Sequence, residues 1–312
     1  MKASSKHFDE RKTLELTQRD NRDSIKVESP PSSQVVVDIA GQSHIGNLRC
    51  DNQDYFLAVR LERSLNTHLT NLPPGVLPQK VEEIAYGIAV ADGMGGMPAG
   101  WLASSLALRK LIDLVVKTPD WIMRMNRRKA AVVKRRMTQR FRQIDLALRA
   151  RGEGDPRLAG MGSTLTAACS LGADLFVGHI GDSRAYLLRD GDLRQLTHDH
   201  TLAQAMIDAG AASADDAVVH PMRRVLMAAL GSTGQPSDPE VQRLYLRNED
   251  QLLLCTDGLT EYVDSERITS ILRKSSSADE ACSALIAAAL AGGGNDNVTV
   301  VLARYRFPQP AP

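Results

Sequence analysis

Three short acid-bearing segments, far apart in the chain, constrain this sequence more than any other feature. In each of them an Asp stands where an apolar run meets a Gly- or Asn-rich turn; the three residues are Asp92, Asp257 and Asp296. An apolar run indicates a rigid strand, and a turn at its end exposes one side chain. If the three Asp side chains converge, they form an oxygen-rich pocket of the kind that binds hard cations such as Mg²⁺ or Mn²⁺. The pattern therefore predicts a metal-dependent enzyme.

Charge and aromatic content weigh against a nucleic-acid partner. The 312 residues include 38 Lys and Arg against 37 Asp and Glu, and 4% of them are aromatic. Balanced charge gives no electrostatic reason to bind a polyanion, and few aromatic side chains are available to stack on bases. Residues 121–150 are an exception, because they predict an amphipathic helix rich in Lys and Arg. We interpret these basic side chains as a solvated helix face, the alternative being a docking surface for an acidic protein or nucleic acid.

Cysteine usage and hydropathy indicate the compartment. The four cysteines are Cys50, Cys169, Cys255 and Cys282, and none forms a CxxC pair. A zinc site, a thiol redox motif and a disulfide framework are therefore not expected, which favours a reducing compartment. The charged first residues do not resemble a secretory signal, and no segment approaches the roughly 20 apolar residues that span a bilayer. We expect a cytoplasmic, monomeric protein that does not enter the membrane.

The chain divides into one central domain and two polar ends. Residues 1–34 are too poor in apolar side chains to offset the entropy of ordering, so we expect a flexible tail there. Residues 35–305 carry the strand and helix patterns of a single catalytic domain. Residues 306–312 are rich in Pro and are expected to be disordered.

Periodicity predicts the secondary structure of the central domain. Strands are expected at residues 35–40, 55–60, 85–92, 163–170, 173–180, 185–189, 241–246, 251–256 and 297–305. Helices are expected at residues 99–116, 121–150, 201–210, 222–230, 265–273 and 278–291. The turn at Asp190 and Gly191 between two apolar runs is a strong hairpin signal. Because hairpin-linked strands and separate helical blocks replace βαβ units, we predict an α+β fold with antiparallel sheets.

Seven motifs in a fixed order make the functional prediction specific. They are Arg49–Asp54 (RCDNQD), Asp92–Gly96 (DGMGG), Gly160–Leu165 (GMGSTL), Val177–Tyr186 (VGHIGDSRAY), Leu196–His200 (LTHDH), Cys255–Leu259 (CTDGL) and Gly294–Thr299 (GNDNVT). Over about residues 38–304 the chain resembles the metal-dependent Ser/Thr protein phosphatases, or protein phosphatase type 2C, in their compact bacterial form. The resemblance implies a four-layer α-β-β-α sandwich of two antiparallel sheets flanked by helices.

The resemblance also implies a binuclear Mg²⁺ or Mn²⁺ centre. Asp92 is expected to bridge the two metals, the Gly93 carbonyl to bind the second, and Asp257 and Asp296 to hold the first. The remaining roles fall on three residues: Asp54 is expected beside the metals, Asp182 at a third, weaker metal site, and Arg49 on the substrate phosphate. For Asp182, the alternative is that it only caps the turn between Gly181 and Ser183.

The chemistry of these residue types fits phosphate hydrolysis. Two neighbouring cations lower the pKa of a bridging water and offset charge on the phosphoryl group. An Arg presents a planar fork that matches phosphate oxygens. Water is then expected to attack phosphorus in line, so no Cys or Ser nucleophile is needed. The oxygen preference of hard cations also leads us to expect hydrogen-bonding roles, not metal ligation, for His198 and His200.

The chain departs from the family pattern at several positions. Gln53 replaces a Glu found in many members; it adds no charge but can accept a hydrogen bond from water. Met94 replaces the His of animal members and cannot donate a proton to the leaving group. Met97, Pro98 and Trp101 replace small polar or acidic residues, and residues 209–221 occupy the place of the variable flap.

Three hypotheses follow for the function. The first is a phosphoserine and phosphothreonine phosphatase that acts on phosphorylated proteins and opposes a Ser/Thr kinase. The second is a pseudophosphatase that binds a partner, which loss of Asp257 or Asp296 would have favoured; neither residue is lost. The third is a nucleic-acid binder that uses the basic helix, and balanced charge and scarce aromatics count against it.

Overall fold

The computed structural model describes residues 32–96, 98–117, 127–213, 225–232 and 238–308. Several sequence predictions fall outside these ranges. They are most of the expected tail at 1–34, the first six residues of the expected helix at 121–150, Met97, most of the flap at 209–221, and the last residues of the C-terminal tail.

Two antiparallel sheets form the centre of the molecule. The first sheet has the spatial order β1 (Val36–His44), β11 (Val298–Arg306), β10 (Gln251–Cys255), β7 (Arg184–Arg189) and β8 (Asp192–Gln195). The second has the order β2 (Asp54–Asn66), β3 (Lys80–Met94), β5 (Leu165–Leu171), β6 (Asp174–Ile180) and β9 (Glu240–Tyr245), and β4 (Gly162–Ser163) pairs with the end of β3. Every pairing within them is antiparallel.

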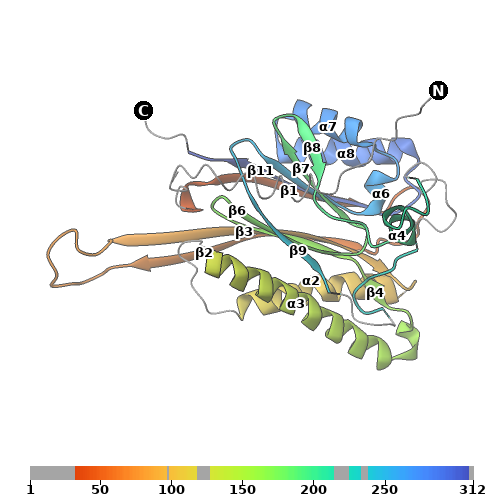
Figure 1. Ribbon diagram of the computed structural model, residues 1–312, viewed down its shortest axis with the longest axis horizontal. Coiled ribbons are helices and arrows are strands. Elements are labelled where there is room, and N and C mark those ends of the chain that lie inside the picture. Colours follow the sequence, from red (N-terminus) through yellow and green to blue (C-terminus); the bar gives the residue numbers. More distant parts are fainter. Residues whose placement is uncertain (1–31, 97, 118–126, 214–224, 233–237, 309–312) are drawn as a thin grey trace.

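Helices cover the outer face of each sheet (Figure 1). On the second sheet lie α2 (Ala99–Val116) and α3 (Arg127–Glu153), and on the first lie α7 (Ser265–Lys274) and α8 (Ala278–Gly292). The shorter elements are η1 (Ser32–Gln34), η2 (Pro156–Leu158), α4 (Leu202–Asp208) and α6 (Asp257–Thr260). The predicted four-layer α-β-β-α sandwich is thereby confirmed. None of the helices in the described ranges is both long enough and apolar enough to cross a membrane.

Alternating side chains of the central strands fill separate cores. In β10, Leu252 and Leu254 pack between the two sheets, whereas Leu253 packs under α7 and α8. In β3, Ile88 and Val90 likewise face the space between the sheets. Strands buried on both faces read as unbroken apolar runs, which is why the sequence identifies them clearly.

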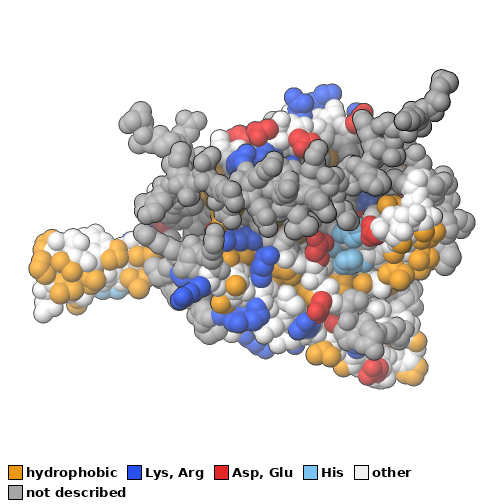
Figure 2. Space-filling view, viewed as in Figure 1, with side chains coloured by type: hydrophobic (Ala, Val, Ile, Leu, Met, Phe, Trp, Pro, Cys, Tyr) orange, Lys and Arg blue, Asp and Glu red, His pale blue; other side chains and the backbone are white. Residues whose placement is uncertain are grey.

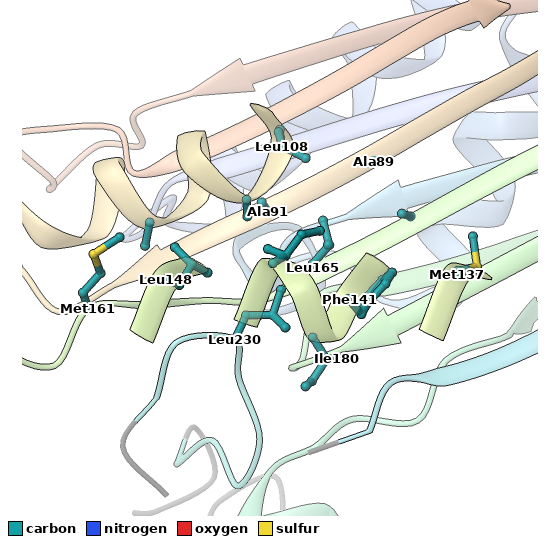
Figure 3. Close-up of a cluster of buried hydrophobic side chains, with 14 of the residues drawn as sticks. Ala89, Ala91, Leu108, Met137, Phe141, Leu148, Met161, Leu165, Ile180 and Leu230 are labelled. Atoms are coloured by element: carbon teal, nitrogen blue, oxygen red, sulfur yellow. The ribbon is translucent and has the colours of Figure 1, made fainter. Parts of the chain in front are cut away.

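A third core lies between the second sheet and the helix pair α2 and α3. Figure 3 shows side chains of β3, β5 and α3 meeting in this layer, among them Ala91, Leu165 and Phe141. On α3 the buried residues Met137, Phe141 and Leu148 recur at helical spacing, as the sequence predicts. Figure 2 shows Lys and Arg side chains gathered over the same helix, in agreement with a basic outer face.

Two sequence predictions are wrong in this part of the structure. The helix expected at 222–230 is not formed in its described part, 225–230. There Leu226 forms a β-bridge with Thr201, and Leu230 forms one with Ser163. The two leucines are four residues apart, as on one face of a helix, but each of them pairs with a different segment. The strands expected at 55–60 and 85–92 are also much longer, since β2 and β3 continue as a projecting arm (Figure 1).

The two ends of the predicted domain differ slightly from expectation. Ser32, assigned to the flexible tail, accepts a hydrogen bond on its hydroxyl from the Ile84 backbone N–H at 3.0 Å. Strand β11 extends through Arg306, and the Phe307 N–H donates to Asn248 at 2.9 Å. The four cysteines, all among the described residues, are free thiols, as expected.

Candidate active site

The turn after Asp92 is built by close backbone packing. Asp92 of β3 lies opposite Asp54 of β2, so the pairing of these strands brings two of the predicted acids together. The next residue must be glycine, because a Cβ on Gly93 would collide with the carbonyl oxygen of Gly100. Helix α2 therefore begins directly against the strand end that carries Asp92.

Hydrogen bonds to both its N–H and its carbonyl hold the backbone of Asp92 in place. Its N–H donates to the Thr164 hydroxyl at 3.0 Å, and its carbonyl accepts from the Thr164 N–H at 2.9 Å. The Ser163 hydroxyl donates to the same carbonyl at 3.0 Å. The motif Gly160–Leu165, which the sequence did not link to a role, thus holds Asp92 in place.

Asp54 is buried beneath this turn, with 4% of its surface exposed. The Thr256 hydroxyl donates to its Oδ2 at 2.7 Å, whereas its Oδ1 has no hydrogen-bond partner in the described structure. Burial raises the pKa of Asp54 to about 7, although Thr256 and Thr299 act in the opposite direction. A buried carboxylate oxygen without a partner is costly, so this position fits a carboxylate that serves a bound cation.

Two further acids come from the first sheet and its loops. Asp257 is the first residue of α6, directly after β10, and a Cβ on the following Gly258 would collide with the Asn297 carbonyl. Asp182 follows Gly181, whose φ of +113° favours glycine. Burial and the nearby Asp257 raise the pKa of Asp182 to about 8.

These acids repel one another around a shared space. Burial raises the pKa of Asp92 well above its ordinary value, and Asp54, Asp257, Asp182 and Asp296 add to the shift in that order. A cavity of about 470 Å³ has Asp92, Asp182 and Asp257 in its wall. Within the described ranges no three acidic, His or Cys side chains already close on a single point as metal ligands. The space between the acids nevertheless carries strong negative potential.

Asp296 and Arg49 form a pair beside this cavity. The Arg49 Nη2 lies 2.6 Å from Asp296 Oδ2, and Asp296 Oδ1 accepts the N–H of Asn297 at 2.8 Å. Neither Asp296 nor Arg49 lines the cavity. The hydrogen bond to Asp296 is the main cause that raises the pKa of Arg49, and the charges of Asp92 and Asp257 also contribute. The guanidinium therefore lies in the field of the acids.

Asn297 organises the loop before β2, a role that the sequence did not reveal. Its Oδ1 accepts the Gln53 N–H at 2.8 Å, and its Nδ2 donates to the carbonyls of Ile45 and Asp51 at 2.8 and 2.9 Å. A buried amide that joins three points of one loop fixes the segment carrying Arg49 and Asp54. The only signal in the sequence was its place beside Asp296.

The histidines near the site make hydrogen bonds, as the sequence analysis expected. His200 Nδ1 accepts the Gly181 N–H at 3.1 Å, and this bond supports the turn of Asp182. His198 Nε2 lies 2.7 Å from Asp208 Oδ2. Behind them His179 is buried against the Thr166 hydroxyl, and burial lowers its pKa to about 3.

Three of the residues that depart from the family pattern, Gln53, Met94 and Trp101, lie in the described part of the chain. The side-chain amide of Gln53 donates to Asp51 at 2.8 Å, and its Oε1 lies so close to Gly100 that a Cβ at position 100 would displace the Gln53 side chain. Met94 lines the cavity. The indole of Trp101, at the first turn of α2, is exposed. The thioether at position 94 has no proton to donate.

The donor set suits hard divalent cations. Its members are carboxylates and backbone carbonyls, oxygen ligands that Mg²⁺ and Mn²⁺ prefer. The partnerless Oδ1 of Asp54 and the raised pKa values of Asp54, Asp92 and Asp182 all indicate that positive charge would stabilise the ionised acids. The residues present thus fit a metal centre.

Comparison with known proteins identifies the family of this chain. The sequence profile of the family described as Protein phosphatase 2C matches residues 79–292. The chain is 42% identical over 230 residues to the serine/threonine protein phosphatase PstP of Mycobacterium tuberculosis, covering 72% of this chain and 42% of that protein. The chain therefore belongs to the protein phosphatase 2C family, and it spans less than half the length of this relative.

Other similarities cover most of the matched proteins. The serine/threonine phosphatase stp of Listeria welshimeri is 34% identical over 222 residues, which cover 71% of this chain and 85% of that protein. The crystal structure of the Mycobacterium tuberculosis phosphatase PstP matches with a TM-score of 0.70 at 35% identity, over 87% of this chain and 100% of that chain. A structure described as the PstP catalytic domain with two manganese ions matches with a TM-score of 0.68 at 33% identity, over 87% and 99%.

Proposed function

We propose that this chain is a Mg²⁺- or Mn²⁺-dependent protein phosphatase that hydrolyses phosphoserine and phosphothreonine in proteins phosphorylated by a Ser/Thr kinase. The observation that carries the proposal is the meeting of Asp54, Asp92, Asp182 and Asp257, drawn from four separate segments, around one strongly negative space. Membership of the family and the two manganese ions described for the PstP catalytic domain support it.

The proposed ligands are the oxygens around this space. Asp92 and the Gly93 carbonyl would be ligands of one metal. Asp92, Asp257 and Asp296 would be ligands of the other. Asp182 would serve a third, weaker site. A divalent pair supplies positive charge to the phosphoryl group and lowers the pKa of water. Asp296 would have to exchange its contact with Arg49 for this role, which the exposure of Arg49 makes easy.

The chain's own residues then position substrate and water. Arg49 lies in the field of the acids, and its guanidinium can present two parallel N–H groups to phosphate oxygens. Asp54 is placed beside Asp92 to accept a hydrogen bond from water. Water attacks phosphorus in line, and the Ser or Thr oxygen leaves. No residue of the chain becomes phosphorylated, so no nucleophilic side chain is required.

Protonation of the leaving oxygen falls to solvent. Met94 has no exchangeable proton, and it lines the same cavity as Asp92 and Asp257. Pro98, which precedes α2, and Trp101 cannot act as acids either. We therefore propose that a water molecule in the cavity donates this proton.

Release of phosphate from a phosphothreonine peptide tests the proposal. Wild-type protein with Mn²⁺ is expected to release phosphate, and EDTA should abolish the release. Asp257→Asn should remove most of the activity while the protein stays folded, and Asp238→Asn, an exposed acid paired with Arg142, serves as the matched control. A well-folded wild-type protein that releases no phosphate with Mn²⁺ or Mg²⁺ from several phosphopeptides would contradict the proposal and favour a pseudophosphatase.

A further inference from the structure

The projecting arm of β2 and β3 ends in a long uncharged segment, which we call the arm tip. It comprises residues 64–79, which contain no Asp, Glu, Lys or Arg. Its large apolar side chains are all exposed, Leu69 at 95% of its surface; the others are Leu65, Leu72, Val76 and Leu77. Figure 2 shows hydrophobic atoms lying open along this arm. Exposed apolar side chains gathered in one place indicate a surface that binds another surface.

The loop of the arm tip satisfies several of its own polar groups. The Thr67 N–H donates to the Gln79 carbonyl at 2.9 Å, and the Thr67 hydroxyl donates to the Pro78 carbonyl at 2.9 Å. The Leu72 N–H donates to the Thr70 hydroxyl at 3.1 Å. The three prolines of the loop have no N–H at all. These features lower the cost of moving the loop out of water.

The apolar side chains of the arm lie on the side of the second sheet that helices α2 and α3 cover. Leu57 and Ala89, paired on β2 and β3 where the arm begins, both pack in the core under these helices. The pairing of the two strands continues outward without a bulge, so every second residue keeps the same side. Leu61 and Leu65 are therefore also on the helix-covered side, where they are exposed.

The charges of the arm itself cancel and lie mainly on the other side. Two ion pairs lie there, Arg60 with Glu62 and Lys80 with Glu82. On the helix-covered side Arg63 lies opposite Glu83, which is buried. Beyond this pair the helix-covered side of the arm is uncharged up to its end.

Helix α3 adds positive charge on the helix-covered side. Residues 127–142, its first half, include eight Lys or Arg and no Asp or Glu. Three of the basic side chains that are exposed are Arg128, Lys134 and Arg135. Leu61 of the arm and Val133 of α3 line one cavity, so this half of the helix lies beside the base of the arm (Figure 1). An exposed apolar segment next to a basic surface is the combination with which peripheral proteins bind anionic membranes.

Charge disfavours a second copy of the chain as the partner of this surface. Pairing the helix-covered sides of two arms would bring the basic halves of two α3 helices towards each other, and like charges facing each other oppose association. A surface of anionic lipids complements these charges and can also take up the apolar side chains of the arm tip.

We propose that the arm tip, together with Arg128, Lys134 and Arg135 of α3, binds the surface of a membrane that contains anionic lipids. The leucines enter the boundary between head groups and acyl chains, and the basic side chains contact the head groups. No part of this surface crosses the bilayer. The contact differs from the sequence expectation of no membrane partner, because leucines scattered through a loop form no long apolar run.

Sedimentation of the full chain with lipid vesicles tests the apolar part of this surface. We expect binding to phosphatidylcholine vesicles with about one-third phosphatidylserine, and binding roughly tenfold weaker or less to pure phosphatidylcholine. Leu69→Asp should weaken the binding by about tenfold or more, since it removes a leucine from the lipid boundary. Val36→Asp, at an exposed position of β1 in the first sheet, is the matched control and should bind as wild type.

The basic part needs a second pair of variants. Lys134→Gln combined with Arg135→Gln should weaken binding to the anionic vesicles by roughly tenfold or more. The control combines Arg273→Gln with Lys274→Gln, which removes two exposed basic residues from α7 on the first sheet and should leave the affinity nearly unchanged. Added salt should weaken wild-type binding, because it screens the attraction between these side chains and the head groups.

Three results would overturn the proposal. The first is wild-type protein that does not sediment with the anionic vesicles; if it instead self-associates and Leu69→Asp abolishes this, the arm binds a second copy. The second is equal binding to pure phosphatidylcholine, and the third is wild-type affinity in the Leu69→Asp variant. The readout requires neither metal nor phosphopeptide, so failure here would leave the proposed phosphatase activity unaffected.

Discussion

The Nη2 atom of Arg49 lies 2.6 Å from Oδ2 of Asp296 and joins the loop before β2 to the loop before β11. The Arg49 side chain is 53% exposed and that of Asp296 is 19% exposed. Ion pairs so open to solvent contribute about 0–1 kcal/mol to stability. The importance of this pair therefore lies in where it holds the guanidinium, not in the stability of the fold.

Replacing Arg49 should show separately what its side chain contributes to stability and to catalysis. Arg49→Ala is expected to change the free energy of unfolding by less than about 1 kcal/mol. It should lower kcat/KM for a phosphopeptide by roughly tenfold to a hundredfold, because charged hydrogen bonds to phosphate are lost. Steady-state kinetics and urea unfolding measure the two quantities. Arg142→Ala, which removes an equally exposed Arg and breaks its pair with Asp238, is the control and should leave kcat/KM unchanged.

Removing the Thr256 hydroxyl should weaken the support of Asp54. This hydroxyl donates to Asp54 Oδ2 at 2.7 Å and accepts the Thr299 N–H at 3.0 Å. Thr256→Val keeps the side-chain shape but leaves buried polar groups without partners, so the free energy of unfolding should fall by about 1–3 kcal/mol. Urea unfolding measures the loss. Thr138→Val, at a half-buried position of α3 where the hydroxyl makes a solvent-exposed hydrogen bond, should cost far less, and equal losses in the two variants would contradict the interpretation.

Stability in EDTA should fall as the pH rises from about 6.5 to 8. The folded-state pKa of Asp54 is raised to about 7 and that of Asp182 to about 8, so in this window the folded chain binds more protons than the unfolded chain. The free energy of unfolding then decreases with pH. Between about pH 4 and 6.5 the lowered pKa of His179 has the opposite sign and offsets the trend.

Urea unfolding at several pH values in EDTA checks this dependence. Asp182→Asn removes one titrating group and should flatten the decrease between pH 6.5 and 8. Addition of Mn²⁺ at pH 8 should restore stability, since a ligand that binds only the folded state stabilises it. A wild-type protein whose stability rises over this window in EDTA would show that the acids are not held as the structure indicates.

A cavity created between the two sheets should lower the stability of the protein without removing a residue of the candidate active site. Leu254 of β10 is completely buried between the two sheets. Leu254→Ala should lower the free energy of unfolding by about 2–5 kcal/mol through lost burial and a residual cavity. Val36→Ala, at an exposed position of β1, should stay within about 0.5 kcal/mol. Denaturant titration distinguishes the two, and a loss below about 1 kcal/mol for Leu254→Ala would contradict the packing described.

Local sequence patterns were sufficient to predict the structure of segments whose conformation depends mainly on their own residues. The helix predicted at residues 99–116 matches α2, since the apolar pattern that predicts it lies within the segment. The turn after Asp92 was evident from its glycines. By contrast, the extension of β2 to Asn66 depends on pairing with Lys80 across a long hairpin, which local alternation does not reveal.

The missing parts of the site depend on contacts between distant segments. Asn297 joins three backbone groups of the loop before β2, and Thr256 binds Asp54 from 202 residues away. Neither contact has a periodic signature. The segment ending at Leu230 was assigned to a helix because its apolar spacing fits one, whereas its residues bridge to Thr201 and Ser163. Tertiary pairing overrode the local pattern there.

Counting the Mn²⁺ ions bound at equilibrium tests the central claim most directly. Electron paramagnetic resonance of free Mn²⁺ during titration gives the number held by each chain. We predict two tightly bound ions for the wild-type protein, and at least one fewer for Asp92→Asn, with Asp238→Asn unchanged. A wild-type chain that binds no Mn²⁺, or an Asp92→Asn variant that binds as many ions with the same affinity, would contradict the assignment of the aspartate cluster as a metal centre.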